Sequence, residues 1–133
     1  MPTIPWTPFL RRVLFADAAM SGFSAIVLIF GAGLLSGLLG LPATLLLVAG
    51  ILLVPFSAGV AFVASRSDAA LPAIWAILLA NAGWALASIA LLFTGWIAPT
   101  ALGVSFIIAQ AIVVAAFAEM QFISVRRRPA IAV

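Results

Sequence analysis

Residues 43–65 read ATLLLVAGILLVPFSAGVAFVAS, a run of apolar and small side chains that contains no charged residue. An α-helix needs about 20 consecutive apolar residues to cross the hydrocarbon core of a bilayer. Three further runs of this kind occur, so the sequence predicts four membrane-spanning helices. Their expected ranges are residues 13–37, 43–65, 72–95 and 100–125.

The composition of the whole chain favours lipid as its solvent. Hydrophobic residues make up 67% of the 133 positions and charged residues only 7%, whereas about a quarter of the residues in a soluble domain are charged. A soluble fold of this length would lack the polar side chains needed to cover its surface. Disorder is excluded too, because disordered segments have low hydrophobicity. We therefore expect a single membrane domain over residues 1–133.

Short connections separate the expected helices at residues 40–42, 65–68 and 96–100. Consecutive helices joined in this way are antiparallel neighbours. The predicted fold class is therefore an all-α membrane protein, a four-transmembrane-helix antiparallel bundle. A cleaved signal peptide is the competing interpretation of the N-terminus. The first apolar run is about twice the usual length for such a peptide and contains Asp17, so we expect a permanent first helix.

The arginines predict the orientation of the helices. All six lie before the first expected helix, between the second and third, or after the fourth, and these places are on one side of the membrane. Loops on the cytoplasmic side carry the excess of basic residues, so we expect both termini in the cytoplasm. Trp6, Trp75 and Trp96 fall near the expected interfaces, where tryptophan is enriched. The six residues are Arg11, Arg12, Arg66, Arg126, Arg127 and Arg128.

Several reactive residue types are missing from the chain. There is no His, Cys, Lys or Tyr, which removes the usual general base, the thiolate nucleophile, the Schiff-base amine and the common metal ligands. We expect no enzymatic activity, no cofactor and no metal site. Nucleic-acid binding is not expected either, because the arginines lie beside apolar segments and not in a polar basic stripe.

Three polar side chains are expected in the same half of the membrane. By helical rise, Asp17 lies about 7 Å, Glu119 about 10 Å and Asn81 about 13 Å inside the cytoplasmic edge. If their helices face one another, the three residues form one polar site. Intramembrane carboxylates commonly serve proton or ion transport. The structural alternative is that the helix dipole favours Asp17 and that Arg11, Arg12 or Arg126 reaches down to either carboxylate.

Small and polar residues mark the surfaces where the helices are expected to touch. On the first helix, Asp17, Ser21 and Ser24 share one side, and Gly33 and Gly37 form a GxxxG pair for close packing.

Pro55 is expected to kink the second helix, with Ser57 satisfying backbone groups that the kink frees. Asp68 is expected to be a solvated or helix-capping loop residue.

The fourth helix carries polar residues on two sides. Gln110 and Glu119 are separated by about 900° of rotation and point in opposite directions, whereas Gln121 shares the face of Gln110. One of these faces must look away from the bundle, which suggests contact with another subunit. The alternative is that the Glu119 side chain extends toward the membrane interface, where water solvates its carboxylate. The indole of Trp84 needs a hydrogen-bond acceptor, and Asn81 or Ser88 is expected to provide it.

The chain resembles small uncharacterised four-span integral membrane proteins of bacteria. This resemblance implies a topology and no mechanism. The chain does not resemble the small multidrug transporters, which place a glutamate in the middle of the first helix. The segments that carry the resemblance are Ala16-Asp17-Ala18-Ala19-Met20-Ser21-Gly22, Gly40-Leu41-Pro42, Asn81-Ala82-Gly83-Trp84 and Ala109-Gln110-Ala111.

These observations favour a small non-enzymatic protein of the bacterial inner membrane. Its expected partners are the lipid bilayer and either further copies of itself or another membrane protein. The alternative function is a compact proton- or cation-coupled transporter of a small solute that uses Asp17, Glu119 and Asn81.

Overall fold

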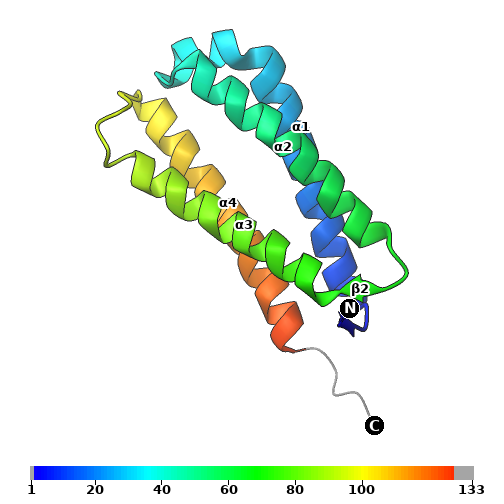
Figure 1. Ribbon diagram of the computed structural model, residues 1–133. Helices are drawn as coiled ribbons and strands as arrows, with labels where there is room; N and C mark the ends of the chain where they lie inside the picture. Colours follow the sequence, from blue (N-terminus) through cyan, green and yellow to red (C-terminus); the bar gives the residue numbers. More distant parts are fainter. Residues whose placement is uncertain (1, 128–133) are drawn as a thin grey trace.

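The computed structural model describes residues 2–127, so Arg128 lies outside the described residues. Within this range four helices follow one another: α1 (Pro8–Leu39), α2 (Ala43–Ser65), α3 (Leu71–Leu91) and α4 (Ala101–Arg126) (Figure 1). All four are long and apolar enough to cross a membrane. The prediction of an all-helical chain with four such helices is confirmed.

Two helix ends differ from the expected ranges by four residues or more. α1 begins at Pro8 and not at residue 13, because the Thr7 hydroxyl caps the helix by accepting a hydrogen bond from the Leu10 amide at 3.1 Å. Proline is also well suited to the first position of a helix. α3 ends at Leu91 and not at residue 95, and the chain then turns at Gly95, where φ is 75°. Glycine adopts this left-handed conformation without steric cost.

A two-stranded sheet, which the sequence analysis did not predict, holds the N-terminal segment in place. β1 (Thr3–Ile4) pairs antiparallel with β2 (Ala69–Ala70), and Ile4 lies opposite Ala69. The Leu71 amide donates a further hydrogen bond to the Pro2 carbonyl at 3.0 Å. Strands of two residues are too short to show an alternating pattern, so no sequence signal marked them.

The helices form two antiparallel hairpins. α1 packs along α2, and α3 packs along α4; α1 also contacts α4, whereas α2 and α3 scarcely meet (Figure 1). The hairpins are therefore joined along α1 and α4 and stand apart on the side of α2 and α3.

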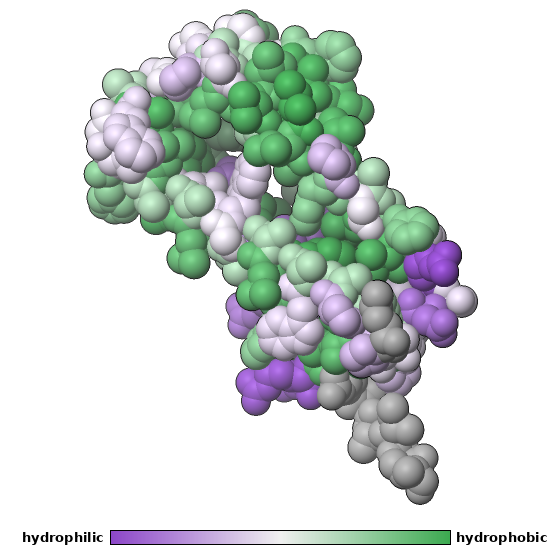
Figure 2. Space-filling model, in the orientation of Figure 1, coloured by the Kyte–Doolittle hydropathy of each residue, from purple (hydrophilic) through white to green (hydrophobic). Residues whose placement is uncertain are grey.

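Most of the molecular surface is apolar. Large hydrophobic side chains are exposed on every helix, among them Phe30 and Leu86, and Figure 2 shows an extensive hydrophobic surface. The hydrophilic colours of Figure 2 gather mainly toward the lower end of that view. Arg11, Arg12, Arg66, Arg126 and Arg127 lie at the ends of α1, α2 and α4 that meet there. We call this end of the molecule the arginine end.

Arg11 links α1 to the end of α2. Its guanidinium lies 4.4 Å from the centre of the Trp6 ring and donates hydrogen bonds to the carbonyls of Ala64 at 3.0 Å and Arg66 at 3.4 Å. The Trp6 indole donates to the same Arg66 carbonyl at 3.0 Å. A cation is favourable at a helix C-terminus, where carbonyls lack partners within the helix.

At the opposite end of the molecule, the C-terminus of α1 contacts the start of α4. The Thr100 amide donates to the Leu39 carbonyl at 3.0 Å, and the Thr100 hydroxyl donates to the Leu38 carbonyl at 2.9 Å. Gly103 faces the Leu39 carbonyl so closely that a Cβ atom there would collide with it. This close contact requires glycine and fixes the two hairpins at this end.

The expected role of the GxxxG pair is wrong within this chain. Gly33 and Gly37 are exposed, and a Cβ atom at either would meet nothing within 4 Å. The close approach of α1 and α2 occurs instead at Gly50, where a Cβ atom would lie 3.0 Å from the Leu28 Cβ and 3.2 Å from the Ala25 carbonyl oxygen. Gly50 of α2 therefore permits the close packing at this point.

The expected roles of Ser57 and Asp68 also need correction. α2 continues through Pro55, and the Ser57 hydroxyl donates to the Ala18 carbonyl of α1 at 2.9 Å, not to backbone groups of α2. Asp68 is exposed, and the residue at the N-cap of α3 is Ala70, which makes no side-chain capping bond. Asp68 is therefore solvated, as one of the two expectations stated, and does not cap the helix.

Candidate functional site

Three polar side chains are buried where α1, α3 and α4 come together. Asp17 is 2% exposed, Asn81 is 4% exposed and Gln121 is fully buried. Asp17 lies in the early part of α1 and Gln121 in the last turns of α4, so this polar cluster is nearer to the arginine end. Buried polar groups are stable in such a place only when hydrogen-bonded.

Hydrogen bonds connect the cluster completely. Asp17 Oδ2 accepts one bond from Asn81 Nδ2 and one from Gln121 Nε2, each at 2.7 Å. Asn81 Nδ2 also donates to Gln121 Oε1 at 3.2 Å, and Asp17 Oδ1 accepts from the Ser21 hydroxyl at 3.4 Å. We call these four residues the Asp17 network. It joins the two hairpins through their side chains.

Arg11 and Arg126 contact groups outside this network. Arg11 binds the carbonyls at the end of α2, and the Arg126 guanidinium lies 5.8 Å from the centre of the Phe122 ring. Within the described residues, the donors that reach Asp17 are two amides and one hydroxyl, all of them uncharged. The expectation that Arg11 or Arg126 reaches down to Asp17 is therefore wrong for these two residues.

Of the three residues predicted to form one polar site, the structure brings Asp17 and Asn81 together and leaves Glu119 apart. Glu119 is exposed on the outward side of α4, and Gln121 occupies the place beside Asp17. The reason is the rotation of α4 about its axis, which turns Gln110 and Gln121 inward and so turns Glu119 outward. Gln121 was expected only as a packing residue. Its position on the same helix face as Gln110 was the one signal that could have identified it.

The hydrogen-bond acceptor of the Trp84 indole is not one of the two residues expected from the sequence. Its indole Nε1 donates to Gln110 Oε1 at 3.0 Å, and Gln110 Nε2 donates to the Ile107 carbonyl at 2.9 Å. Ser88, one of the two expected acceptors, donates instead to the backbone carbonyl of Trp84 at 2.7 Å. The bond therefore links α3 to α4, whereas the expected partners lie on the same helix as Trp84.

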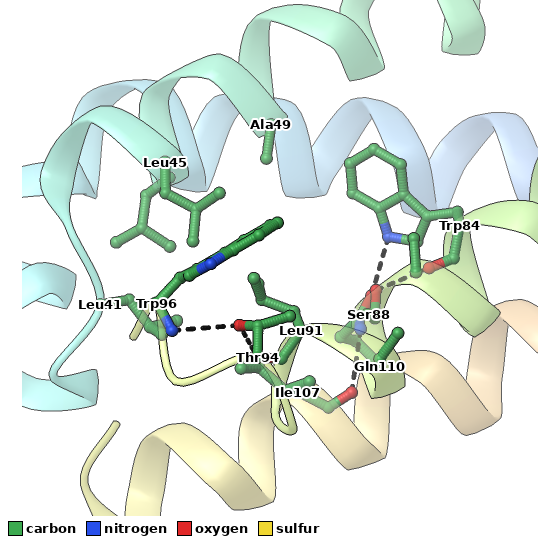
Figure 3. A pocket seen from close by; sticks show the side chains of 13 residues that line it. Leu41, Leu45, Ala49, Trp84, Ser88, Leu91, Thr94, Trp96, Ile107 and Gln110 are labelled. Carbon is green, nitrogen blue, oxygen red and sulfur yellow. Dashed lines mark hydrogen bonds between the residues drawn. The ribbon is translucent and has the colours of Figure 1, made fainter. Parts of the chain in front are cut away.

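An apolar cavity of about 530 Å³ lies between the hairpins, toward the end away from the arginines (Figure 3). Leu45 and Ala49 of α2 face it from one side, and Trp84 and Leu91 of α3 from the other. Trp96 extends into it from the connection between α3 and α4. The surface is hollowed here because α2 and α3 stand apart (Figure 2).

A second cavity, of about 360 Å³, adjoins the Asp17 network, and we call it the carboxylate cavity. Asp17, Ser21 and Ser24 of α1 line one side of it, as expected from their common helix face. Trp84 and Gln110 line both this cavity and the apolar one, so their hydrogen bond lies where the two cavities meet.

The chemistry available here is the binding of a proton or a cation by one carboxylate. Within residues 2–127, no group of three His, Cys, Asp or Glu side chains is placed to hold a metal ion. The side chains of the Asp17 network act as hydrogen-bond donors and acceptors, and none of them is a strong nucleophile.

No protein-family model, curated protein or solved structure matches the chain.

Proposed function

We propose that the protein is a non-enzymatic, multi-pass protein of the bacterial inner membrane with both termini in the cytoplasm. The arginines of the described chain support this orientation, because they belong to the ends of α1, α2 and α4 that meet at one end of the molecule. The use of Arg to the exclusion of Lys supports the bacterial origin.

Within that membrane, its function is to associate with itself or with another membrane protein. The observation that carries this proposal is the outward position of Glu119 on α4. A carboxylate that faces hydrocarbon is costly, and a protein partner with hydrogen-bond donors removes this cost. Ser105 and Ile112 precede Glu119 at intervals of seven residues and are also exposed, so the three lie along one face of the helix.

Cross-linking in the membrane tests self-association. The chain has no cysteine, so Ile112→Cys introduces a single thiol in the middle of the proposed interface. We expect a disulfide-linked dimer, because a two-fold interface brings equivalent residues together. Leu86→Cys, on an exposed position of α3, is the matched control and should remain monomeric.

Glu119→Gln tests the part played by the carboxylate. This variant keeps the shape of the side chain and removes its charge, so it should change the amount of Ile112→Cys dimer or of a co-purifying protein. A monomeric mass in lipid nanodiscs, no cross-link and no co-purifying membrane protein would together contradict the proposal.

The second candidate function is a proton- or cation-coupled transporter of a small solute. It is favoured by one observation, that Asp17 belongs to the lining of the carboxylate cavity. The polar site for transport then consists of Asp17, Asn81 and Gln121, with Gln121 in the place expected for Glu119. Proton-dependent uptake into reconstituted vesicles that is lost in Asp17→Asn would support it. Equal uptake by the variant and the unmodified protein would contradict it.

A further inference from the structure

We propose that the carboxylate cavity binds a small organic cation, with an ammonium group held by Asp17 Oδ1 and an apolar or aromatic body lying in the cavity. The inference deepens the second candidate function, because it names the class of ligand. It concerns binding alone, so it can be tested separately from transport.

The two oxygens of the Asp17 carboxylate are used unequally. Oδ2 accepts two short bonds from the amides of Asn81 and Gln121, each at 2.7 Å. Among residues 2–127, Oδ1 accepts only from the Ser21 hydroxyl, at 3.4 Å, which is long for a bond between two oxygens. A carboxylate oxygen can accept at least two hydrogen bonds. Oδ1 therefore has room for a stronger donor, and Ser21 and Asp17 both line the cavity.

The negative charge of the Asp17 carboxylate also favours a positively charged ligand. The donors that reach Asp17 from the described part of the chain are uncharged, and its side chain is 2% exposed. A buried carboxylate is costly unless an opposite charge accompanies it. An ammonium group at Oδ1 would supply this charge and form the stronger, charge-assisted type of hydrogen bond. The polarity of the site thus selects a cation over an anion or a neutral solute.

The remaining lining of the cavity suits the body of such a ligand. Its volume of about 360 Å³ is within the usual range for sites that bind small molecules. Trp84, Phe106 and Phe117 contribute aromatic side chains, and aromatic rings attract cations as well as apolar groups. Ser24 adds a hydroxyl on the same side as Asp17. One buried negative charge among aromatic side chains is the complement of an aromatic ammonium ion.

Equilibrium dialysis of the protein in nanodiscs of uncharged lipid tests this inference, with empty nanodiscs as the blank. The probe is 1-naphthylmethylammonium, and its neutral counterpart is 1-naphthalenemethanol. We expect saturable binding of the ammonium and binding of the alcohol that is at least about tenfold weaker, as the loss of a charge-assisted hydrogen bond predicts. Equal affinity for the two probes would overturn the inference.

Two carboxylates of the membrane-spanning helices provide a matched pair of variants. Asp17→Asn should weaken binding of the ammonium about 10- to 100-fold. Glu119→Gln should leave it unchanged, because Glu119 is exposed on the other side of α4. An equal effect of both substitutions, or of neither, would show that the probe does not use Asp17.

Ser24→Phe keeps the inference testable if Asp17→Asn does not fold. This substitution fills the cavity and leaves the Asp17 carboxylate in place, so binding should be lost. Unchanged affinity in the folded variant would overturn the inference.

Saturable binding without vesicle uptake would support the ammonium site and contradict transport. Uptake of inorganic cations without binding of the probe would support transport and contradict the ammonium site.

Discussion

The side-chain amide nitrogen of Gln121 lies 2.7 Å from Oδ2 of Asp17, and the two residues are 104 positions apart in the sequence. This bond joins the first helix to the last. The Asn81 amide reaches the same oxygen from α3, so one atom of one carboxylate holds three helices together.

Replacing Gln121 by leucine should destabilise the protein. Gln121→Leu removes a donor to a buried carboxylate and leaves Asn81 as the only amide bound to Oδ2. We expect the free energy of unfolding to fall by about 1–2 kcal/mol, the range for buried polar contacts between membrane helices. Reversible unfolding in mixed micelles measures the change. Glu119→Gln, an uncharged replacement on the outward face of the same helix, should not change the free energy of the monomer, and equal values for both variants would contradict the role given to the network.

Two glycines of α2 should respond oppositely to a methyl group. In Gly50→Ala the new Cβ would lie 3.0 Å from the Leu28 Cβ and 3.2 Å from the Ala25 carbonyl oxygen, so α1 and α2 must separate. Overpacking of this kind costs about 1–3 kcal/mol.

Gly59→Ala is the control for this pair, because nothing lies within 4 Å of its Cβ. Alanine there should leave stability unchanged or raise it by up to about 1 kcal/mol, since alanine is the better helix former. The melting temperatures of the two variants in one detergent provide the comparison. A loss at Gly59→Ala as large as that at Gly50→Ala would contradict the described packing of α1 against α2.

Trp84 and Gln110 should be energetically coupled. A double-mutant cycle with Trp84→Phe and Gln110→Leu isolates the indole hydrogen bond, for which we expect about 0.5–1.5 kcal/mol. A cycle with Trp84→Phe and Ser88→Ala is the control, because the Ser88 hydroxyl binds the backbone carbonyl of Trp84 and not the indole. Unfolding free energies of the six forms give both coupling terms. Coupling of Ser88 as strong as that of Gln110 would contradict the assignment of the indole partner.

Labelling with a membrane-impermeant maleimide should report the orientation of the chain. Ala98→Cys, in the exposed connection between α3 and α4, should react in intact cells. Ser67→Cys, in the exposed connection between α2 and α3, should react only after the membrane is opened. The expectation follows from the arginines at the Ser67 end of the molecule. The opposite pattern of labelling would place both termini outside the cytoplasm.

The helices were predictable because length and hydropathy alone define them. Residues 43–65 form α2 with the expected bounds, since a helix satisfies the backbone hydrogen bonds of the segment within itself inside lipid. The paired segments Thr3–Ile4 and Ala69–Ala70 were not predictable, because their pairing depends on where two distant parts of the chain meet in space.

The candidate site was predictable only in part. Asp17 and Asn81 were placed together because helical rise put both within about 13 Å of the same membrane edge. The choice between Glu119 and Gln121 depended on how α4 is rotated. α4 carries apolar residues on all its sides, so periodicity could not settle that rotation. The rotation is fixed by contacts with the other helices, such as the bond from Trp84 to Gln110.

The order of synthesis determines when the Asp17 network can form. Asp17 leaves the ribosome 64 residues before Asn81 and 104 residues before Gln121. At about 5–20 residues per second, roughly 5–20 s pass before the last partner is made. During this interval α1 enters the bilayer with a carboxylate that neither amide yet binds. Because Asp17 lies only about 7 Å from the arginines of the first turns of α1, water at the membrane surface can solvate it until the second hairpin arrives.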